Sequence, residues 1–527
     1  MAVNRLRKIS RRTILSGALS AVGLYADSHA SSGSFPVTRP MKGLMLIGSR
    51  QHNEENDTAR IQRAIDAAHI RGGGTVRVPS GIFVCGTIQL RSNVSLWLDN
   101  GAQLKMSANA ADFLPIEQLS YDPKADYGTS DFHHALLMCD GGEQIAIYGE
   151  GVIQGPGPHG TEPKSIALRR CRSVSIRGIT IWESANYGIS MLGCDFVKVD
   201  GVSLHKCYSD GIDPDCCRSV RIANCFVESV DDAICLKSSG ALGELRSTED
   251  ITVENCILKT ASIHFKCGTE SCGDFRRITV TNCVFQGGMG MRHGNPGIGL
   301  YTTDGGALTD VLISNIVMRD VGTPIAIIRG NRDRCGRGAP GVIDRVRMTN
   351  ILAKGATLAS VIVGLPNAPV GGISIDQFSV TMASSGDSHR GLNEIPEKPT
   401  AYPDPTMFGS LPVCGFFLRH VTDLQVRDFE MSSVAEETRS TVIADDVRGL
   451  RLAGFRDYGD SQRTCLWLRN VRDSNIKFAD AAAIPDGSCR IEGTETRNLV
   501  LRGDDAAFTA ERIAVINGDV PKGAIKN

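Results

Sequence analysis

The sequence predicts an all-β protein that folds as a right-handed parallel β-helix, a solenoid, with a short amino-terminal capping helix. Short apolar strands recur along the chain at steps of 23, 23, 31, 27, 33 and 35 residues. Equivalent strands begin at Val174, Val197, Val220, Ile251, Ile278, Val311 and Val346. Because no unit of such a repeat can bury its apolar face alone, neighbouring units are expected to stack into a continuous core.

The residues that follow these strands support the same fold. Each strand alternates apolar and polar side chains and is followed by Asn or Gly, which favour turns. We expect one set of turn residues to form a buried ladder that satisfies backbone groups: Asn224, Asn255, Asn282, Asn315 and Asn350. Cys225, Cys256 and Cys283 share the next position and are expected to point inward as small apolar residues.

The chain before the repeat is expected to cap it. Residues 57–68 carry apolar side chains at helical spacing, and Asp57 is the expected amino-terminal cap of this helix. Terminal units of a solenoid need such a cover to stay soluble. A short amphipathic helix here would therefore close the open apolar end of the β-helix.

The first 30 residues resemble a twin-arginine-type signal peptide. Arg11 and Arg12 precede a weakly apolar run, and small residues end at Ala30. Such a signal implies export of an already folded protein, so we expect a periplasmic or secreted location. No later apolar stretch reaches the length of about 20 residues that a membrane span needs. No membrane contact is expected after the signal is cleaved.

The rest of the chain is expected to form one domain followed by a tail. Residues 31–505 are expected to form a single β-helix domain, and residues 506–527 a carboxy-terminal tail. A polar, proline-rich insertion at residues 384–412 interrupts the repeat. Long insertions in solenoids form loops on one face, which is often the binding face.

Composition limits the possible partners. A formal net charge of −1 leaves no electrostatic basis for binding nucleic acid or an anionic membrane. The 17 cysteines show no zinc-type spacing, so neither a metal nor another cofactor is expected. The expected partner is a polysaccharide or oligosaccharide substrate, and the expected state is a monomer.

Four aspartates give the strongest functional signal. Asp210 and Asp213 lie about one coil before Asp231 and Asp232. Since adjacent rungs of a β-helix lie about 4.8 Å apart, the stack should bring the two pairs side by side. Aspartates also cap turns in solenoids through Asx hydrogen bonds, and that structural role remains the alternative.

Several motifs together resemble glycoside hydrolase family 28, the polygalacturonase-like pectin hydrolases, and in particular a divergent bacterial branch. The resemblance spans roughly residues 43–430 and rests on Asp210-Gly-Ile-Asp-Pro214, Val230-Asp-Asp-Ala-Ile234, Gly268-Thr-Glu-Ser271 and Tyr402-Pro-Asp-Pro-Thr-Met-Phe-Gly409. It implies a β-helical hydrolase in which Asp231 is the general acid. It also implies that Asp210 and Asp232 position and deprotonate the attacking water.

Two features of the family pattern are absent. The position of the family histidine is occupied by Ala261-Ser262-Ile263, although His264 lies next to it. The Arg-Ile-Lys motif that binds the galacturonate carboxylate aligns with Gly299-Leu300-Tyr301. Loss of these groups puts the usual polygalacturonate specificity in doubt.

Carboxylate chemistry gives the same reaction without the resemblance. Inverting hydrolysis of a glycosidic bond needs a protonated acid and an ionised base about 6.5 to 9.5 Å apart. Crowded carboxylates cannot all ionise easily, so at least one should have a raised pKa and remain protonated. Residues on neighbouring rungs can supply both groups.

Charged residues near the aspartates are candidates for substrate binding. They are Asp213, Lys237, Lys266, Glu270 and Arg329. The lysines would replace the missing family cations in binding an acidic sugar, or would pair with the aspartates and tune their pKa. Arg329 would reach a uronate carboxylate from a neighbouring rung, with a surface role as the alternative.

Two other functions remain open. A β-helical polysaccharide lyase or epimerase would abstract a proton beside a carboxylate, and would need calcium or a basic residue there. A catalytically inactive, carbohydrate-binding solenoid is also compatible with the missing histidine, arginine and lysine. Release of reducing sugar would favour hydrolysis, and an unsaturated product would favour elimination. Binding without turnover would favour the inactive solenoid.

Overall fold

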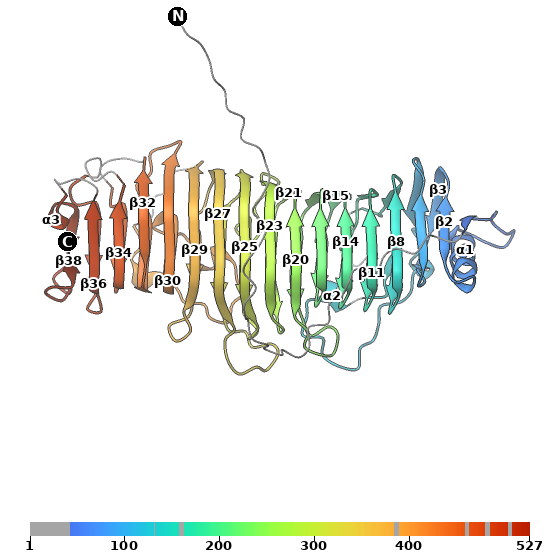
Figure 1. The fold of residues 1–527 in the computed structure, drawn as a ribbon, viewed down its shortest axis with the longest axis horizontal. Coiled ribbons are helices and arrows are strands. Elements are labelled where there is room, and N and C mark those ends of the chain that lie inside the picture. Colours follow the sequence, from blue (N-terminus) through green and yellow to red (C-terminus); the bar gives the residue numbers. More distant parts are fainter. Residues whose placement is uncertain are drawn as a thin grey trace, which may run out of the picture. The chain divides into compact units, whose positions relative to one another are not determined.

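The computed structural model describes residues 43–526 except 131, 158–162, 384–388, 459–462, 480–484 and 504–507. The expected signal peptide, residues 1–30, lies outside the described residues. Within them, strands stack in parallel along one axis, as Figure 1 shows. The protein is therefore an all-β, right-handed parallel β-helix, as predicted.

Three strands make up each early rung, and equivalent strands of successive rungs form three parallel sheets. Sheet 1 begins with β1 (Leu44–Leu46), β2 (Gly74–Val78), β5 (Val94–Leu98), β8 (Glu143–Gly149), β11 (Arg172–Arg177), β14 (Asp195–Asp200), β17 (Arg218–Ala223) and β20 (Thr248–Glu254). Sheet 2 begins with β3 (Gly81–Cys85), β6 (Ala102–Met106), β9 (Val152–Gln154), β12 (Thr180–Trp182), β15 (Ser203–Cys207), β18 (Phe226–Ser229) and β21 (Ile257–Thr260).

Sheet 3 carries the candidate site. Its strands are β4 (Ile88–Gln89), β7 (Ala135–Asp140), β10 (Lys164–Arg169), β13 (Ile189–Leu192), β16 (Ile212–Asp215), β19 (Ile234–Ser238), β22 (Phe265–Ser271), β24 (Pro296–Thr302), β26 (Thr323–Arg329) and β28 (Ser360–Val363). It continues through β31 (Ser440–Arg448), β33 (Leu466–Arg469), β35 (Cys489–Glu492) and β37 (Ala514–Ile516).

Sheets 1 and 2 merge in the second half of the stack, where single long strands serve both. These are β23 (Phe275–Gln286), β25 (Ala307–Arg319), β27 (Val342–Ala356) and β29 (Val370–Met382), and β30 (Val413–Ser433) joins all three sheets. The last strands on this side are β32 (Arg451–Asp457), β34 (Arg472–Phe478), β36 (Arg497–Gly503) and β38 (Ile525–Lys526).

The pairing register confirms the predicted repeat. Val174 pairs with Val197 and Val197 with Val220, and the pairing continues through Ile251 and Ile278. The next partners are Val311 and Val346. Period-2 alternation sets this register, because a slip of one residue would turn every core side chain outward.

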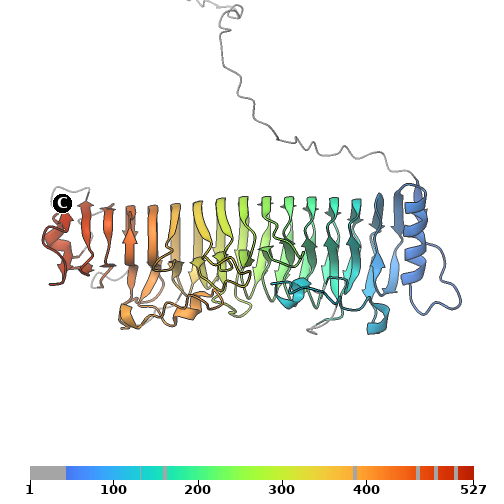
Figure 2. The same cartoon turned by 90° about the horizontal axis from the view of Figure 1, so that it is seen from below.

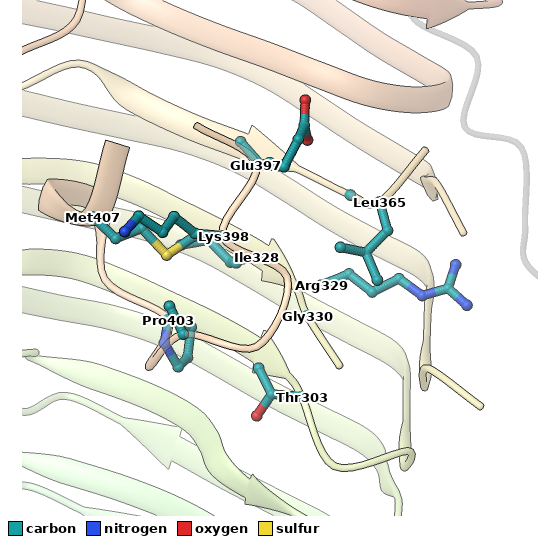
Figure 3. A pocket seen from close by; sticks show the side chains of 12 residues that line it. Thr303, Ile328, Arg329, Gly330, Leu365, Glu397, Lys398, Pro403 and Met407 are labelled. Atoms are coloured by element: carbon teal, nitrogen blue, oxygen red, sulfur yellow. The ribbon is translucent and has the colours of Figure 1, made fainter. Parts of the chain in front are cut away.

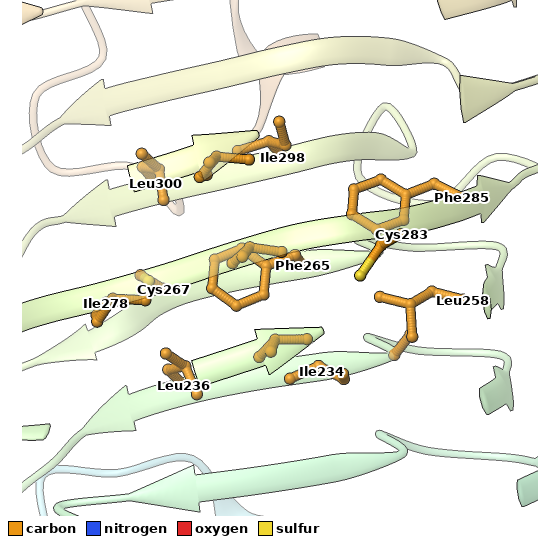
Figure 4. Close-up of a cluster of buried hydrophobic side chains, with 14 of the residues drawn as sticks. Ile234, Leu236, Leu258, Phe265, Cys267, Ile278, Cys283, Phe285, Ile298 and Leu300 are labelled. Carbon is orange, nitrogen blue, oxygen red and sulfur yellow. The ribbon is translucent and has the colours of Figure 1, made fainter. Parts of the chain in front are cut away.

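Inward side chains stack in columns along the stack. Ile234, Phe265 and Ile298 occupy paired positions on β19, β22 and β24, and all three are fully buried. Figure 4 shows this column beside Leu236 and Cys267. Burying each large apolar side chain contributes about 1.5–3 kcal/mol, so the columns hold the rungs together.

The asparagine ladder exists, but the expectation that it is buried is wrong. Asn224, Asn255, Asn282, Asn315 and Asn350 are exposed, with φ between 55° and 57°. Each sits in a left-handed turn, a conformation that asparagine tolerates better than most residues. The amide of Asn350 donates to Asn315 Oδ1 at 2.8 Å, so the ladder joins rungs along the outer surface.

Helix α1 (Thr58–Ile70) confirms the predicted cap. Its buried residues Ile61, Ala64, Ile65 and Ala68 join the core of the first rungs. Asp57 precedes the helix, but its carboxylate makes no capping hydrogen bond. It accepts instead from Val84 N at 2.8 Å and pairs with Arg60 at 2.7 Å, so Asp57 ties the helix to β3.

The β-helix extends past the expected boundary at residue 505. After helix α3 (Ala510–Ile513), β37 pairs with β35 and β38 pairs with β36. The described residues 508–526 therefore continue the β-helix, and the expectation of a separate tail is not met there. Their strands are three and two residues long, too short to be recognised from apolar alternation.

Loops gather along one side of the stack, as Figure 2 shows. They include the segment with α2 (Tyr127–Ser130) and the expected insertion between β29 and β30. In this insertion the described residues 389–412 contain two short 3-10 helices, Leu392–Glu394 and Pro405–Phe408. None of the helices in the described part of the chain is long and apolar enough to span a membrane.

Candidate active site

The aspartates meet at the amino-terminal ends of two neighbouring strands of sheet 3, β16 and β19. Asp210 precedes β16 and Asp231 and Asp232 precede β19, and pairing of Ile212 with Ile234 places these segments side by side. The backbone N–H of Asp232 donates to Asp210 Oδ1 at 3.2 Å. Stacked rungs thus bring the carboxylates together.

Lys237 neutralises the first aspartate pair. Its ammonium group lies 2.9 Å from Asp210 Oδ2 and 2.8 Å from Asp213 Oδ2, and it also donates to the Tyr187 hydroxyl at 2.9 Å. Burial opposes the charged ammonium, but the two carboxylates raise the pKa of Lys237 well above its usual value. Lys237 is therefore a permanent cation at the base of the site.

Lys266 holds Asp232 in the same way. The two groups are 2.7 Å apart, and Lys266 also donates to the hydroxyl of Tyr402 at 3.0 Å. Asp232 Oδ1 accepts from the Ser262 hydroxyl at 2.8 Å and from Ile263 N at 3.1 Å. Burial alone would raise the pKa of Asp232, but Lys266 and these donors lower it.

The pKa values of the buried carboxyl groups are shifted in different directions. Burial, followed by the charge of Asp213, raises the pKa of Asp210 well above its usual value. Burial likewise raises the pKa of Asp213. Asp210 thus holds a proton more strongly than Asp232 does, a separation that suits acid–base chemistry. A carboxyl of raised pKa was expected, and both Asp210 and Asp213 meet this criterion.

Accessibility separates Asp231 from the other three aspartates. Asp210, Asp213 and Asp232 are 5%, 2% and 3% exposed. The side chain of Asp231 is 29% exposed, and its carboxylate lies 3.4 Å from the Arg292 guanidinium. Of the four, Asp231 has the carboxylate that is most accessible to solvent.

Glu270 closes the far side of the cluster. It is fully buried, and its Oε1 accepts from Asp126 N at 3.1 Å, in the loop before α2. Burial favours its neutral form, but Lys237 and then the other donors lower the pKa of Glu270 to about 2. Arg334 binds the Asp126 carboxylate at 3.0 Å, and the adjacent Cys335 forms a disulfide with Cys272. Glu270 thus anchors the loop before α2, which Arg334 also binds.

The structure adds Tyr402 and Asp404, to which the sequence assigned no role in the site. Tyr402, from the 389–412 segment, contacts Lys266 and packs on His293 with ring centroids 5.2 Å apart. His293 Nδ1 lies 3.1 Å from Asp404 Oδ2, and this hydrogen bond raises the pKa of His293, with a further contribution from Asp231. The available signals were the Tyr402-Pro-Asp404 motif and the adjacent cations Arg292 and His293.

His264 does not fill the place of the missing histidine. Its ring is fully buried, its Nδ1 lies 3.0 Å from Pro296 O, and it stacks on Phe285. Burial lowers the pKa of His264, which keeps the imidazole neutral. Ser262 and Ile263 occupy the position beside Asp232 instead.

Arg329 lies at the end of β26, three strands along sheet 3 from β19, and its expected role in substrate binding stays a prediction. Its guanidinium donates to the carbonyl of Pro369 at 2.7 Å. It borders a small hollow together with Thr303, Glu397 and Met407, shown in Figure 3. That hollow measures about 10 Å³, room for about one water molecule, so it does not admit a sugar ring.

A divalent cation would compete with the lysines. Within the described residues, candidate ligand atoms of Asp210, Asp232 and Cys235 lie within 4.8 Å of one another. Both carboxylates already bind an ammonium group, of Lys237 and Lys266. The donor set therefore fits paired lysines better than a metal ion.

The 389–412 segment is anchored by ionic contacts. The Arg419 guanidinium, 1% exposed, donates to the carbonyls of Leu392 and Ile395, both at 2.9 Å. His420 lies between two carboxylates, 2.7 Å from Asp446 and 3.0 Å from Glu397. These contacts hold the segment that brings Tyr402 to Lys266.

We expect stability to fall at alkaline pH through His420. Burial lowers its pKa, but Asp446 and Glu397 raise it from 6.5 to about 9. The folded pKa is the higher one, so this stabilisation is complete below pH 6.5 and is lost as the pH rises through about 9. Melting temperatures between about pH 6 and pH 10 should fall less for His420→Gln than for the wild type. The control His52→Gln changes an exposed histidine and should show the same pH dependence of the melting temperature as the wild type. If the melting temperature of His420→Gln fell with pH as steeply as that of the wild type, His420 would not be the group responsible.

Comparison with known proteins assigns the family. Residues 76–400 match the family model described as Glycosyl hydrolases family 28. The chain belongs to glycoside hydrolase family 28. It is a polygalacturonase-like glycoside hydrolase, as the sequence motifs predicted.

Relatives of this family 28 protein are distant. A polygalacturonase of Ralstonia nicotianae is 23% identical over 384 residues, covering 59% of this chain and 68% of the relative. An endo-polygalacturonase of Pectobacterium carotovorum is 25% identical over 352 residues, covering 60% of this chain and 83% of the relative. Among solved structures, the family 28 exopolygalacturonase of Yersinia enterocolitica has a TM-score of 0.59 at 16% identity, covering 83% of this chain and 78% of that chain. The structural likeness establishes the fold of the family 28 chain.

Proposed function

We propose that this family 28 protein hydrolyses glycosidic bonds in pectin-type, uronate-containing polysaccharides or oligosaccharides, with inversion at the anomeric carbon. The observation that carries the proposal is the meeting of carboxyl groups from two consecutive rungs whose pKa values are shifted in opposite directions. An inverting reaction needs one carboxyl to donate a proton and another to activate water. The cluster offers both.

Asp231 is the proposed general acid, because it is the exposed member of the cluster and lies where a leaving oxygen can approach. Asp232, whose pKa is lowered, would deprotonate the attacking water, and Asp210 would hold that water in position. The buried cations Lys237 and Lys266 would keep the site electrically balanced around an acidic sugar. The raised pKa of Asp210 makes it the competing candidate for the acid.

Elimination is disfavoured by the same electrostatics. A lyase or epimerase that used a lysine to abstract the proton beside the sugar carboxylate would need that lysine in its neutral form. Carboxylate neighbours raise the pKa of both Lys237 and Lys266 well above the usual value, so both stay protonated. The cations suit binding and pKa control rather than proton abstraction.

Product analysis tests the proposal. Defined oligogalacturonides and rhamnogalacturonan fragments would be incubated with the protein, and the first product followed by NMR. Hydrolysis with inversion predicts a new reducing end of opposite anomeric configuration. A product absorbing as an unsaturated uronate would refute hydrolysis, and binding without any turnover would favour an inactive solenoid.

Export in the folded state is the proposed route to the periplasm or exterior. The cysteines outside the Cys272–Cys335 disulfide are free and buried. Cys225, Cys256 and Cys283 stand on successive rungs, near enough for wrong disulfides to form in a partly folded chain. Folding before export would bury these thiols in a reducing compartment.

We expect refolding to depend on the redox state. Recovery of soluble protein after dilution from denaturant should be several-fold higher with reductant than with oxidised glutathione. Replacing Cys225, Cys256 and Cys283 together by Ala should reduce the difference in recovery between the two buffers. Cys489→Ala, at a separate buried position, should leave that difference unchanged. Equal recovery of the wild type in both buffers would remove this support for folded export.

A further inference from the structure

A second hollow lies outside the carboxylate cluster, on the outer surface of sheet 1. Its volume is about 500 Å³, within the usual range for small-molecule sites. Its lining residues are Arg77, Trp97, Asp99, Asn100, Tyr148, Gly149 and Glu150. They come from β2, β5 and β8 and the turns that follow, whereas Asp210 and Asp231 border sheet 3.

Two aromatic rings form the apolar part of this hollow. Trp97 pairs with Tyr148 on the next rung, and their ring centroids are 5.5 Å apart with an interplanar angle of 35°. Trp97 is 38% exposed, unusually open for so large a ring. An aromatic pair of this kind offers a surface on which the CH groups of a sugar ring can stack.

Gly149 keeps the space beside Trp97 open. Its φ of +124° favours glycine, and a Cβ atom there would lie 2.0 Å from Leu98 O and 3.0 Å from Trp97 Cδ1. Any side chain at this position would collide with the wall of the hollow. The absence of a side chain at Gly149 therefore keeps the surface beside Trp97 concave.

Planar polar groups surround the rings. Arg77 Nε lies 2.8 Å and 2.9 Å from the two oxygens of Asp99, which fixes the orientation of both groups. Arg177 lies 5.8 Å from the centre of the Tyr148 ring, and Glu150 lines the hollow. Arg77 and Arg177 together balance the charges of Asp99 and Glu150, so the surface has no strong positive potential of the kind that binds nucleic acid. Donors and acceptors in this arrangement match the paired hydroxyls of a sugar.

We propose that this hollow, named the Trp97 site and defined by Arg77, Trp97, Asp99, Tyr148 and Glu150, binds a pyranose ring of a polysaccharide chain. The ring stacks on Trp97 and Tyr148, and its hydroxyls bind Asp99, Glu150 and the arginines. The ring can come from an acidic backbone or from a neutral side chain of the polymer. The site tethers the polymer on a face separate from the carboxylates.

Affinity electrophoresis tests the Trp97 site without hydrolysis. The full chain carrying Asp231→Asn would be run in gels containing polygalacturonate or, separately, neutral galactan. Retardation in either gel should weaken in Trp97→Ala and Tyr148→Ala, with a rise in Kd of roughly fivefold to tenfold. Trp97→Phe should retain most of the binding because it keeps a ring. Tyr458→Ala is the matched control, since that exposed tyrosine lies on the far rungs.

Each outcome decides the proposal. The gel in which retardation depends on Trp97 identifies an acidic or a neutral ring as the ligand. The proposal would be overturned if Trp97→Ala were retarded as strongly as the parent protein in both gels. It would also be overturned if Tyr458→Ala lost as much retardation as Trp97→Ala. Hydrolysis of short oligogalacturonides by otherwise wild-type Trp97→Ala should be unchanged, and a parallel loss would place Trp97 in the catalytic cleft. Failure of the protein to hydrolyse any substrate would refute the proposed function but leave this binding result intact.

Discussion

Replacing Asp231 by Asn should lower kcat by about 10²–10⁴-fold while leaving substrate affinity largely intact. The amide keeps the shape of the carboxyl group but cannot donate a proton to the leaving oxygen. Asp231 is the exposed aspartate of the cluster, so its replacement does not leave a charge buried without a partner. Initial rates on oligogalacturonides, with Kd measured separately by calorimetry, would separate the two effects.

Asp200→Asn is the matched control for this substitution. The Asp200 side chain is 30% exposed, against 29% for Asp231, but it lies at the end of β14 in sheet 1. Its activity should equal that of the wild type. Near-normal turnover of Asp231→Asn, together with a large loss in Asp210→Asn, would move the acid role to Asp210, whose pKa burial raises.

Replacing Lys237 by Met should lower the free energy of unfolding by about 3–5 kcal/mol. Asp210 and Asp213 would then be buried without the ammonium group that lies 2.9 Å and 2.8 Å from them. Both carboxyls respond by taking up protons, so the loss should shrink as the pH falls. Denaturant unfolding at several pH values would measure both the size and the sign of this change.

Lys198→Met provides the comparison for a surface pair. The Lys198 side chain is 52% exposed and lies 3.9 Å from Asp200. Such a pair contributes about 0–1 kcal/mol, so little change is expected. If Lys237→Met were as stable as Lys198→Met, Lys237 would not be neutralising the buried carboxyls, and the electrostatic account of the site would be wrong.

The sequence determined the stack and the place of the aspartates. Alternation with period 2 fixes which side chains face inward, so the pairing of Val197 with Val220 followed from the sequence. The same stacking brings Asp210 to Asp232, because residues one coil apart must lie on adjacent rungs. Lys237 and Lys266 were recognised as nearby cations for the same reason.

Only the tertiary structure decided which groups reach solvent and which are paired. Tyr402 and Asp404 reach the site from an insertion, and no period in the sequence sets the path of an insertion. The proton preferences of Asp210 and Asp232 depend on burial and on which lysine each one meets, both set by long-range packing. The periodic part of the chain is predictable because local alternation repeats it at every rung. The loops are not, because each is placed by contacts that occur once.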